Sequence, residues 1–466
     1  MNRLPYRKTL FSLLALYGLY ILITGIGIFA FPRYDDQYIK NIDPDRFYGS
    51  ETGQDRVALV EERVYSGISR IDLMERAQHS LDISYYTIQS DTSGDIFWGV
   101  VLSAAQRDVQ VRILLDGIFH PFRGCDRDIL YGLQAHPNIE VRFYEPLNLA
   151  KPWTWHNRLH DKHIIVDEKY AMIGGRNIGD KYFLKDFSGA NVHDRDVVII
   201  NTDVNNTNTS VISDFQCYFQ ELWDHDYTTT RRQPSARHLA CGQQKNEQLL
   251  NFIQQTRENR PDIFTPQDWK VVSFTAKKVT LINNPIQRGT KEPWVWAEMA
   301  CLMEQSEQSI LVQSPYFIPT RAMRKAFPGQ LSDEEIVLLT NNVNSSPNYF
   351  GMAGYYKHRN RLMEMASTIY EYHGDGSIHA KSMVIDERLS IVGSFNVDSR
   401  STFLSTETMV VIDSPEFTQH LLEAIKEITD QSVTASSHQD GESPHWFKSV
   451  IIMTMYVLFY HLDFLL

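Results

Sequence analysis

The 466-residue sequence is poor in cysteine and carries no excess of positive charge. Its four cysteines include no C-x-x-C pair, which excludes the common ligand spacing of a zinc site, and they are too few for a disulfide framework. Cys217 and Cys241 could still pair across a loop if the body lies outside the cytoplasm. Because 45 basic residues stand against 57 acidic ones (formal net charge −12), a broad basic surface for nucleic acid is not expected, although an acidic body can hold a small basic cleft.

The bulk composition is that of a folded protein. Hydrophobic residues make up 43% of the chain and charged residues 22%, which is ordinary for globular domains. The length indicates two to four domains or one large α/β body. A sizeable hydrophobic core is therefore expected.

The N-terminal region holds a long apolar run. No charged residue occurs in Leu10–Phe31, and as a helix this run would reach about 33 Å, enough to span a bilayer. Arg3, Arg7 and Lys8 precede it, so the positive-inside rule predicts a cytoplasmic N-terminus and a translocated body. The run is longer than the apolar core of a signal peptide and lacks an A-x-A cleavage site. We therefore predict an uncleaved transmembrane anchor within residues 1–31.

The C-terminal region is also apolar. Ser449–Leu466 is a hydrophobic run interrupted by His461 and Asp463, and the polar stretch Ser436–Glu442 before it has the composition of a linker. Two interpretations remain open for residues 446–466. They form either a second membrane contact, lying in the interface or inserting, or a helix docked on the core.

The middle of the chain contains an internal repeat. Strand-like runs alternate with helix-like segments in both copies, which is typical of an α/β layer structure. The strand-like runs of the first copy are Leu81–Tyr86, Val111–Gly117 and Val141–Pro146, and those of the second are Ser309–Pro319, Glu335–Asn342 and Thr368–Tyr372. A repeat of this period indicates a duplicated fold.

Both copies end in the same motif, H-x-K-x4-D-x6-G-[GS]-x-N. Its first occurrence begins at His160 and its second at His379. One H-x-K-x4-D pattern alone would be weak evidence, but two copies with the glycine and asparagine at identical offsets exclude coincidence. This doubled motif is the strongest functional signal in the sequence.

The motif residues suit phosphodiester chemistry. In a strand, a histidine and a lysine two residues apart point to one face, as His160 and Lys162 do in the first copy and His379 and Lys381 in the second. One histidine can attack phosphorus while the other protonates the leaving oxygen, and the roles then reverse when water or an alcohol resolves the phospho-histidine. The lysines supply cations for the phosphate oxygens. This scheme needs no metal and no other cofactor.

Further polar residues are expected to bind the phosphate. Asn177 and Asn396, helped by Ser394, can donate hydrogen bonds to its oxygens. The glycine that opens each G-[GS]-x-N turn lets the backbone approach a ligand closely.

Four carboxylates are candidates for a supporting role. Each histidine needs an acidic partner on its second ring nitrogen, and Asp196 and Glu407 follow the two motifs on the next strand-like run. Asp167 and Asp386, the acidic residues of the motif itself, are expected to shape the turn after the strand more than to take part in the chemistry.

The doubled motif resembles that of the phospholipase D superfamily. The resemblance runs from about Val57 to Glu427, and it implies two similar α/β sandwich domains about a pseudo-twofold axis, with the two histidines meeting at their interface. The stretch Ile173–Phe183 (IGGRNIGDKYF) is similar to bacterial cardiolipin synthases, particularly the C-type group. Family precedent favours His160 as the nucleophile, which the residues themselves do not decide.

The predicted fold class is therefore α/β, with two phospholipase D-like domains and an N-terminal transmembrane helix. The predicted boundaries are residues 1–31 for the anchor, 55–225 for the first repeat, 226–270 for a linker, 271–430 for the second repeat and 446–466 for the apolar tail.

Three functions use these residues. The leading hypothesis is a phosphatidyltransferase, which is a cardiolipin synthase if the acceptor is phosphatidylglycerol. Phosphatidylglycerol and phosphatidylethanolamine are the expected lipid partners. The second is a phospholipase D hydrolase that releases phosphatidic acid, and the third is a membrane-anchored phosphodiesterase or exonuclease. The anchor favours a lipid substrate, because a tethered site meets lipid at high effective concentration. The expected location is a bacterial inner membrane with the catalytic body outside the cytoplasm, and the oligomeric state stays open.

Overall fold

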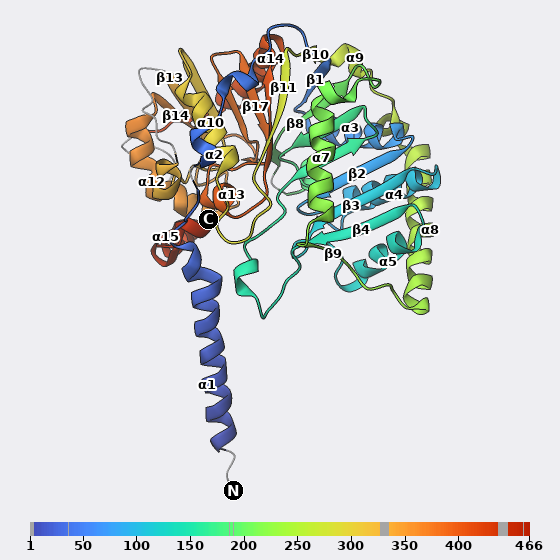
Figure 1. Ribbon diagram of the computed structural model, residues 1–466, viewed down its shortest axis with the longest axis horizontal. Coiled ribbons are helices and arrows are strands. Elements are labelled where there is room, and N and C mark those ends of the chain that lie inside the picture. Colours follow the sequence, from blue (N-terminus) through green and yellow to red (C-terminus); the bar gives the residue numbers. More distant parts are fainter. Residues whose placement is uncertain are drawn as a thin grey trace.

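The computed structural model describes residues 4–35, 37–185, 187–189, 191–326, 335–436, 446–459 and 461–466. Within these residues two large mixed β-sheets lie side by side, and a long helix protrudes from the body (Figure 1). Most of the predicted linker Ser436–Glu442 lies outside the described residues.

The first copy builds a nine-stranded sheet within the described residues, in the order β10-β1-β8-β6-β5-β2-β3-β4-β9. Its strands are β1 (Asp55–Val60), β2 (Ser80–Tyr85), β3 (Gln110–Asp116), β4 (Ile139–Tyr144), β5 (Lys162–Val166), β6 (Tyr170–Gly174), β8 (Asp196–Asn201), β9 (Thr228–Thr230) and β10 (Phe274–Thr275). Strands β2, β3 and β4 are parallel, whereas β5, β6, β8 and β1 continue the sheet antiparallel.

The second copy repeats this topology in an eight-stranded sheet of the described residues, in the order β11-β18-β17-β16-β12-β13-β14-β19. Its strands are β11 (Lys278–Asn283), β12 (Ser309–Gln313), β13 (Glu335–Asn341), β14 (Thr368–Tyr372), β16 (Ser382–Ile385), β17 (Leu389–Gly393), β18 (Thr408–Asp413) and β19 (Ser432–Thr434). Read from β1 and from β11, the two sheets have the same strand order, which confirms the predicted α/β fold of two similar units.

The described residues form fifteen α-helices, of which the first protrudes from the body and most of the others cover the sheets (Figure 1). They are α1 (Leu4–Ile21), α2 (Gln37–Lys40), α3 (Arg63–Arg76), α4 (Thr92–Gln106), α5 (Arg127–Ala135), α6 (Asp180–Phe183), α7 (Val211–Asp224), α8 (Ala236–Asn259), α9 (Trp269–Val272), α10 (Trp294–Glu304), α11 (Arg321–Lys325), α12 (Tyr349–Met365), α13 (Ser399–Phe403), α14 (Pro415–Thr429) and α15 (Trp446–Phe459). Helices α3, α4 and α8 cover the outer face of the first sheet, and α10 and α12 lie on the second domain.

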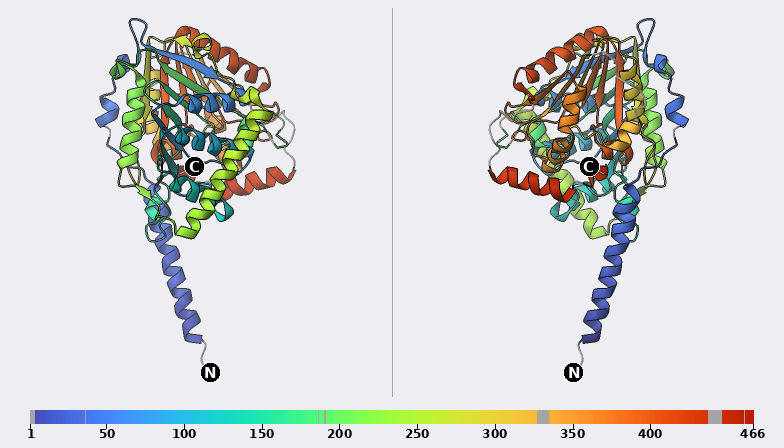
Figure 2. Two further views of the ribbon diagram at one scale, coloured as in Figure 1. Left: turned by 90° about the vertical axis from the view of Figure 1, so that its right-hand side faces the viewer. Right: turned by 90° about the vertical axis from the view of Figure 1, so that its left-hand side faces the viewer.

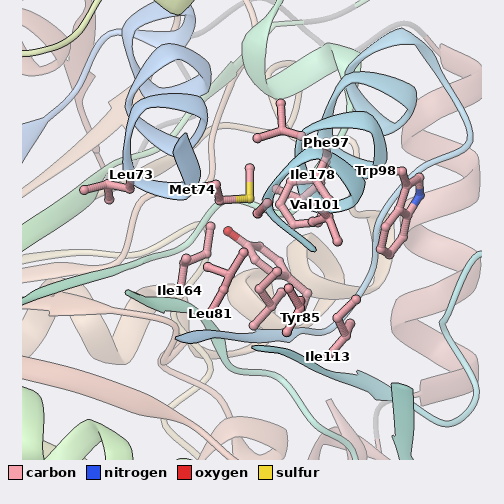
Figure 3. Close-up of a cluster of buried hydrophobic side chains, with 14 of the residues drawn as sticks. Leu73, Met74, Leu81, Tyr85, Phe97, Trp98, Val101, Ile113, Ile164 and Ile178 are labelled. Atoms are coloured by element: carbon pink, nitrogen blue, oxygen red, sulfur yellow. The ribbon is translucent and has the colours of Figure 1, made fainter. Parts of the chain in front are cut away.

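The outer core of the first domain joins α3 and α4 to the sheet (Figure 3). Met74 of α3 and Phe97 of α4 lie over Leu81, Ile113 and Ile164 of the central strands, and all five are at most 3% exposed. Strand β5 is buried on both faces, which explains why its sequence KHIIV is a nearly continuous apolar run rather than an alternating one.

A separate core joins the two domains. It combines inner-face residues of both sheets, such as Ile165 and Val384, with Phe215 of α7 and Phe417 of α14. Helix α7 contacts β11 of the second sheet, and α14 contacts β1 of the first, so the contacts are reciprocal. This shared apolar core fixes the two sheets relative to each other and thereby positions the residues at their junction.

Two backbone bridges next to the motif histidines cross between the domains. Strand β7 (Val192–His193) pairs in parallel with β15 (Ser377–Ile378), and an isolated parallel bridge joins Leu159 to Thr406. In each bridge the residue before a motif histidine lies beside the segment that precedes β8 or β18 of the other domain. The bridges therefore exchange side chains between the two copies.

The N-terminal helix continues through one π-helical turn and one 3₁₀ turn, so its helical path ends at Phe29. Lys8–Phe29 is the one described helical segment long and apolar enough to cross a membrane, with a mean hydropathy of 2.0 and only 6% burial. Its C-terminal part docks on the body. The carbonyl oxygen of Gly25 lies 2.8 Å from Nε2 of His156, and the Tyr20 hydroxyl donates to the carbonyl oxygen of Ala150 at 2.7 Å.

Helix α15 lies at the end of the body from which α1 protrudes (Figures 1 and 2). It packs against α12, and Ile452 is buried in that contact. Its opposite side carries an exposed apolar stripe of Val450, Met453 and Val457, spaced three and four residues apart. The four cysteines are all free, so Cys217 and Cys241 do not form a disulfide.

Candidate active site

The two motif histidines face one cavity of about 480 Å³, a volume within the range of small-molecule sites. The cavity lies at the junction of the two domains, because its walls come from both copies. Among its lining residues are Tyr86, His160, Tyr316, His379, Asn396 and Arg400.

His160 lies two residues before the start of β5, and residues of the second domain complete its surroundings. Its backbone N–H donates to Oγ1 of Thr406 at 3.1 Å, beside the bridge that joins Leu159 to Thr406. Its Nδ1 lies 2.9 Å and 3.0 Å from the two carboxylate oxygens of Glu407. Nε2 is therefore the ring nitrogen left for chemistry.

His379 is completed in the same way by the first domain. Its backbone N–H donates to the carbonyl oxygen of His193 at 2.7 Å, at the end of the β7–β15 pair. Its Nδ1 lies 2.5 Å from Oδ2 of Asp194. Both imidazoles thus have one nitrogen held by a buried carboxylate from the other copy, which orients the ring and fixes its tautomer.

The prediction that Asp196 supports a histidine is wrong. Its carboxylate binds two buried arginines, Arg70 at 2.9 Å and Arg176 at 2.7 Å, in the interior of the first domain. The strand register explains the difference. Gly174 pairs with Asp196, and Gly393 pairs with Met409 in the second sheet. The residue equivalent to Glu407 therefore lies two positions before Asp196, at Asp194.

The prediction of Glu407 as a histidine partner names a residue that does contact a histidine, but across the domain boundary. Glu407 follows the second motif in sequence yet binds His160, the histidine of the first. Sequence order suggested the pairing within one copy. Only the packing of the two sheets reveals the exchange.

The two motif lysines are buried beside their histidines. Nζ of Lys162 donates to the carbonyl oxygen of His160, and Nζ of Lys381 to that of His379. The Lys381 ammonium also lies 3.0 Å from Nδ1 of His379. Both lysines are 1% exposed, and burial lowers their pKa, to about 7 for Lys162 and about 8 for Lys381.

The glycine–serine difference between the motifs follows from the two carboxylates. A Cβ atom at Gly175 would lie 2.3 Å from Oδ1 of Asp194, so only glycine fits there. At the equivalent position of the second copy, the hydroxyl of Ser394 donates to Glu407, the partner of His160. The hydroxyl hydrogen of Ser394 is therefore used in the hydrogen bond to the Glu407 carboxylate.

The two motif asparagines differ in their surroundings. Asn396 lines the cavity. Asn177 is 7% exposed and donates to the Tyr182 hydroxyl at 3.4 Å, while its side-chain oxygen has no hydrogen-bond partner among the described residues. An unpaired buried amide oxygen is costly unless a ligand or water satisfies it, which is consistent with a place at a binding site.

The acidic residue of each motif accepts hydrogen bonds from the backbone at the start of a neighbouring strand. The Asp167 carboxylate accepts hydrogen bonds from the backbone N–H groups of Gln78, His79 and Ser80, at the start of β2. Asp386 does the same at the start of β12, where it accepts from Glu307, Gln308 and Ser309. Both aspartates have positive φ angles near 52°, as expected for the turn after each strand.

Burial dominates the electrostatics of the site. It lowers the pKa of His160 well below its ordinary value, and it lowers that of His379 to about 4, with nearby lysines acting in the same direction. Both shifts favour the neutral form of the imidazoles. Burial also raises the pKa of Glu407 to about 7, whereas His379 and Lys381 outweigh burial at Asp194 and lower its pKa overall.

A larger cavity of about 610 Å³ lies between α3, α4 and α8 in the first domain. Its walls are mainly apolar, and no histidine occurs among the described residues that line it. The smaller cavity is therefore the site that brings nucleophiles, acids and cations together.

Sequence reasoning missed three residues of this site. Asp194 was hidden by the neighbouring Asp196, although the sequence D-R-D offers both. Thr406 and Arg400 lie outside the doubled motif. The strand register supplies Asp194 once the β6–β8 pairing is known.

A family model described as "Cardiolipin synthase, PLD-like domain" matches residues 71–223 and 299–429 of this chain. These segments fall in the first and the second domain. The match agrees with the two-copy architecture that the sheets display.

Curated relatives cover most of the chain. A Helicobacter pylori protein described as uncharacterized is 27% identical over 80% of this chain and 79% of its own length. Cardiolipin synthase C of Escherichia coli is 30% identical over 79% of this chain and 83% of its own length. Among solved structures, phosphatidylserine synthase of Haemophilus influenzae superposes with a TM-score of 0.63 at 13% identity, covering 92% of this chain and 100% of that chain, which bears on the fold alone.

Proposed function

Because the chain belongs to the cardiolipin synthase family with phospholipase D-like domains, we propose that it is a phosphatidyltransferase that makes cardiolipin. It would transfer the phosphatidyl group of one phospholipid to the alcohol of another, phosphatidylglycerol. One observation carries this proposal. Two imidazoles face one cavity, and each is held at Nδ1 by a carboxylate from the opposite copy.

In the first step, Nε2 of His160 attacks the phosphorus of the donor lipid. The P–N bond forms as the bond to the head-group oxygen breaks, and the protonated imidazole of His379 gives its proton to that oxygen. Glu407 stabilises the positive charge that develops on His160. His379 gains the required proton when the anionic phosphate enters, because a nearby negative charge raises the pKa of an imidazole.

In the second step, the hydroxyl group of the acceptor attacks the phosphorus of the phospho-histidine. His379, now neutral, takes the hydroxyl proton at Nε2 as the new P–O bond forms and the P–N bond to His160 breaks. The buried Asp194 stabilises the imidazolium that results. With water in place of the alcohol, the same residues would release phosphatidic acid.

The remaining motif residues have supporting roles in this proposal. Lys162 and Lys381 neutralise the non-bridging oxygens, where their charge has more effect than in water because both are buried. Asn177 and Asn396 donate hydrogen bonds to the same oxygens. Ser394 acts on Glu407 rather than on phosphate, since its hydroxyl already donates to that carboxylate.

The position of the anchor supports a lipid substrate. The end of the apolar helix rests on the loop that carries Trp155 and His156, and both of these residues line the cavity. Leu147 and Leu149 of the same loop are exposed beside the helix. We propose that this loop dips into the membrane interface and that the body lies outside the cytoplasm, so that lipids reach the cavity laterally.

A product assay tests the function. The purified full-length protein in mixed micelles of phosphatidylglycerol and phosphatidylethanolamine is compared with His160→Ala and His379→Ala. His163→Ala serves as a matched control, because His163 is fully buried among Phe215 and Phe219, away from the cavity. We expect cardiolipin from the wild type and the control, and a loss of about a thousandfold or more in the two motif variants.

The possible products separate the hypotheses. Phosphatidic acid as the sole product would replace the transferase by a hydrolase. Cleavage of a single-stranded oligonucleotide without any lipid turnover would overturn the lipid proposal altogether. Accumulation of a mass adduct on His160 in the His379→Ala variant would identify the nucleophile, whereas an adduct on His379 in His160→Ala would reverse the two roles.

A further inference from the structure

The cavity contains a cation that the doubled motif does not account for. Arg400, in α13, lines the cavity together with both motif histidines. Its charge lowers the pKa of His160, which places the guanidinium within electrostatic reach of the reaction centre. Its side chain is partly buried rather than solvated.

Arg400 differs from the other arginine of the cavity in its partners. Arg158 has a carboxylate partner, since its guanidinium binds the buried carboxylate of Asp116 at 3.2 Å. Among the described residues, the ion pairs do not include Arg400. Its side chain donates one hydrogen bond, to the carbonyl oxygen of Leu465 at 2.6 Å. The neighbouring Asp398 carboxyl accepts from the backbone N–H of Ser401, and Arg400 acts on it through its charge alone, which opposes the rise in pKa that burial causes at that carboxyl.

A guanidinium that lines a cavity and forms no ion pair with a carboxylate in the described part of the chain fits an anion. Arginine has five N–H donors in a planar fork that matches two oxygens of a phosphate. In the proposed mechanism, two lysines neutralise the donor phosphate, and two histidines supply the nucleophile and the acid. A cation outside that set is unnecessary for hydrolysis, in which the acceptor is water, but it is useful when the acceptor carries a phosphate of its own.

We propose that Arg400 forms an acceptor subsite that binds the phosphodiester of the phospholipid alcohol. This inference rests on the proposed transferase function and deepens it. With its phosphate on Arg400, the acceptor directs its free hydroxyl toward the phospho-histidine. That hydroxyl forms the new P–O bond, His379 takes its proton, and the P–N bond to His160 breaks.

The internal repeat supplies a matched control. Arg400 lies four residues after Asn396, and Lys181 lies four residues after Asn177, so the two cations occupy equivalent positions in the two copies. Lys181 does not belong to the cavity wall described above, and its ammonium lies 4.9 Å from the centre of the Tyr182 ring. Loss of Lys181 therefore removes an equivalent charge without touching the subsite.

A competition between two acceptors tests the subsite. Full-length protein in micelles of phosphatidylglycerol receives 1-butanol, a neutral alcohol, and mass spectrometry measures cardiolipin and phosphatidylbutanol. Both products arise from one phospho-enzyme, so their ratio cancels donor binding and the fraction of folded protein. We expect Arg400→Ala to lower the ratio of cardiolipin to phosphatidylbutanol by about ten- to hundredfold, the loss expected for a hydrogen-bonded charge.

Two further variants sharpen the result. Arg400→Lys keeps the charge but not the fork, and we expect a smaller fall in the ratio. Lys181→Ala should leave the ratio at the wild-type value. A ratio within about twofold of the wild type in both Arg400 variants would overturn the proposal, and Arg400→Lys alone decides if Arg400→Ala yields no product. A wild type that forms neither product refutes the proposed function instead of the subsite.

Discussion

Replacement of Asp194 by asparagine is the most direct test that a carboxylate of the first copy orients His379 of the second. The Asp194 carboxylate is 1% exposed and lies 2.5 Å from Nδ1 of His379. Asparagine has nearly the same shape, but its amide nitrogen can donate to Nδ1. The imidazole would then carry its proton on Nε2, the atom that must take the acceptor's proton in the second step.

The size of the effect follows from what is lost. General acid–base catalysis by a positioned side chain contributes about 10²- to 10⁴-fold, and the wrong tautomer forfeits it. We therefore expect kcat for cardiolipin formation to fall by about 10²- to 10⁴-fold, with little change in KM, because the asparagine leaves the shape of the cavity intact.

Asp196→Asn is the control, two residues away. This change removes the carboxylate that binds Arg70 and Arg176 in the interior, and breaking such a buried pair costs about 3–5 kcal/mol of unfolding free energy. We expect a lower Tm, with nearly normal kcat for the protein that stays folded. The assay measures kcat together with the folded fraction from thermal unfolding. Normal kcat in Asp194→Asn, or a catalytic loss in fully folded Asp196→Asn, would refute the reasoning.

Three other outcomes are expected. The value of kcat/KM falls as pH rises through about 7 to 8, because burial lowers the pKa of Lys162 to about 7 and that of Lys381 to about 8, and each lysine then loses its proton. A kcat/KM profile that stays flat to pH 9 contradicts this. With the other cysteines replaced by serine, the exposed Cys217 reacts with a membrane-impermeant maleimide in intact cells if the body is extracytoplasmic, and only after lysis if it is not. Met453→Asp combined with Val457→Asp lowers activity several-fold on bilayer vesicles but not on micelles, as expected if α15 lies in the interface; equal losses on both would place α15 in a purely structural role.

Much of the fold could be predicted from the sequence because the same pattern occurs twice. Alternating strand-like and helix-like segments, closed by one repeated motif, indicate two copies of one α/β unit. The identical strand order of the two sheets follows from that repeat. The short strand β10 could not be foreseen in this way, since it lies after the second copy has begun but pairs with β1 of the first sheet.

The site was predictable only where its residues repeat. Both histidines and both lysines stand at fixed offsets, and the structure brings all four together at one junction. The acidic partners stand at unequal distances from their motifs, Asp194 after Asn177 and Glu407 after Asn396, because the loops before β8 and β18 differ in length. No periodicity within one copy can show that a side chain serves the other.

The exchange of carboxylates between the copies restricts how the two domains can diverge in evolution. Neither copy contains a whole catalytic unit, so the arrangement is that of a twofold dimer whose subunits have been fused into one polypeptide. A duplicated domain is usually free to diverge once its twin retains the activity. Here a substitution at Asp194 removes the hydrogen-bond partner of His379, and a substitution at Glu407 removes that of His160. The two copies cannot diverge independently, because each supplies the carboxylate that orients the other's histidine.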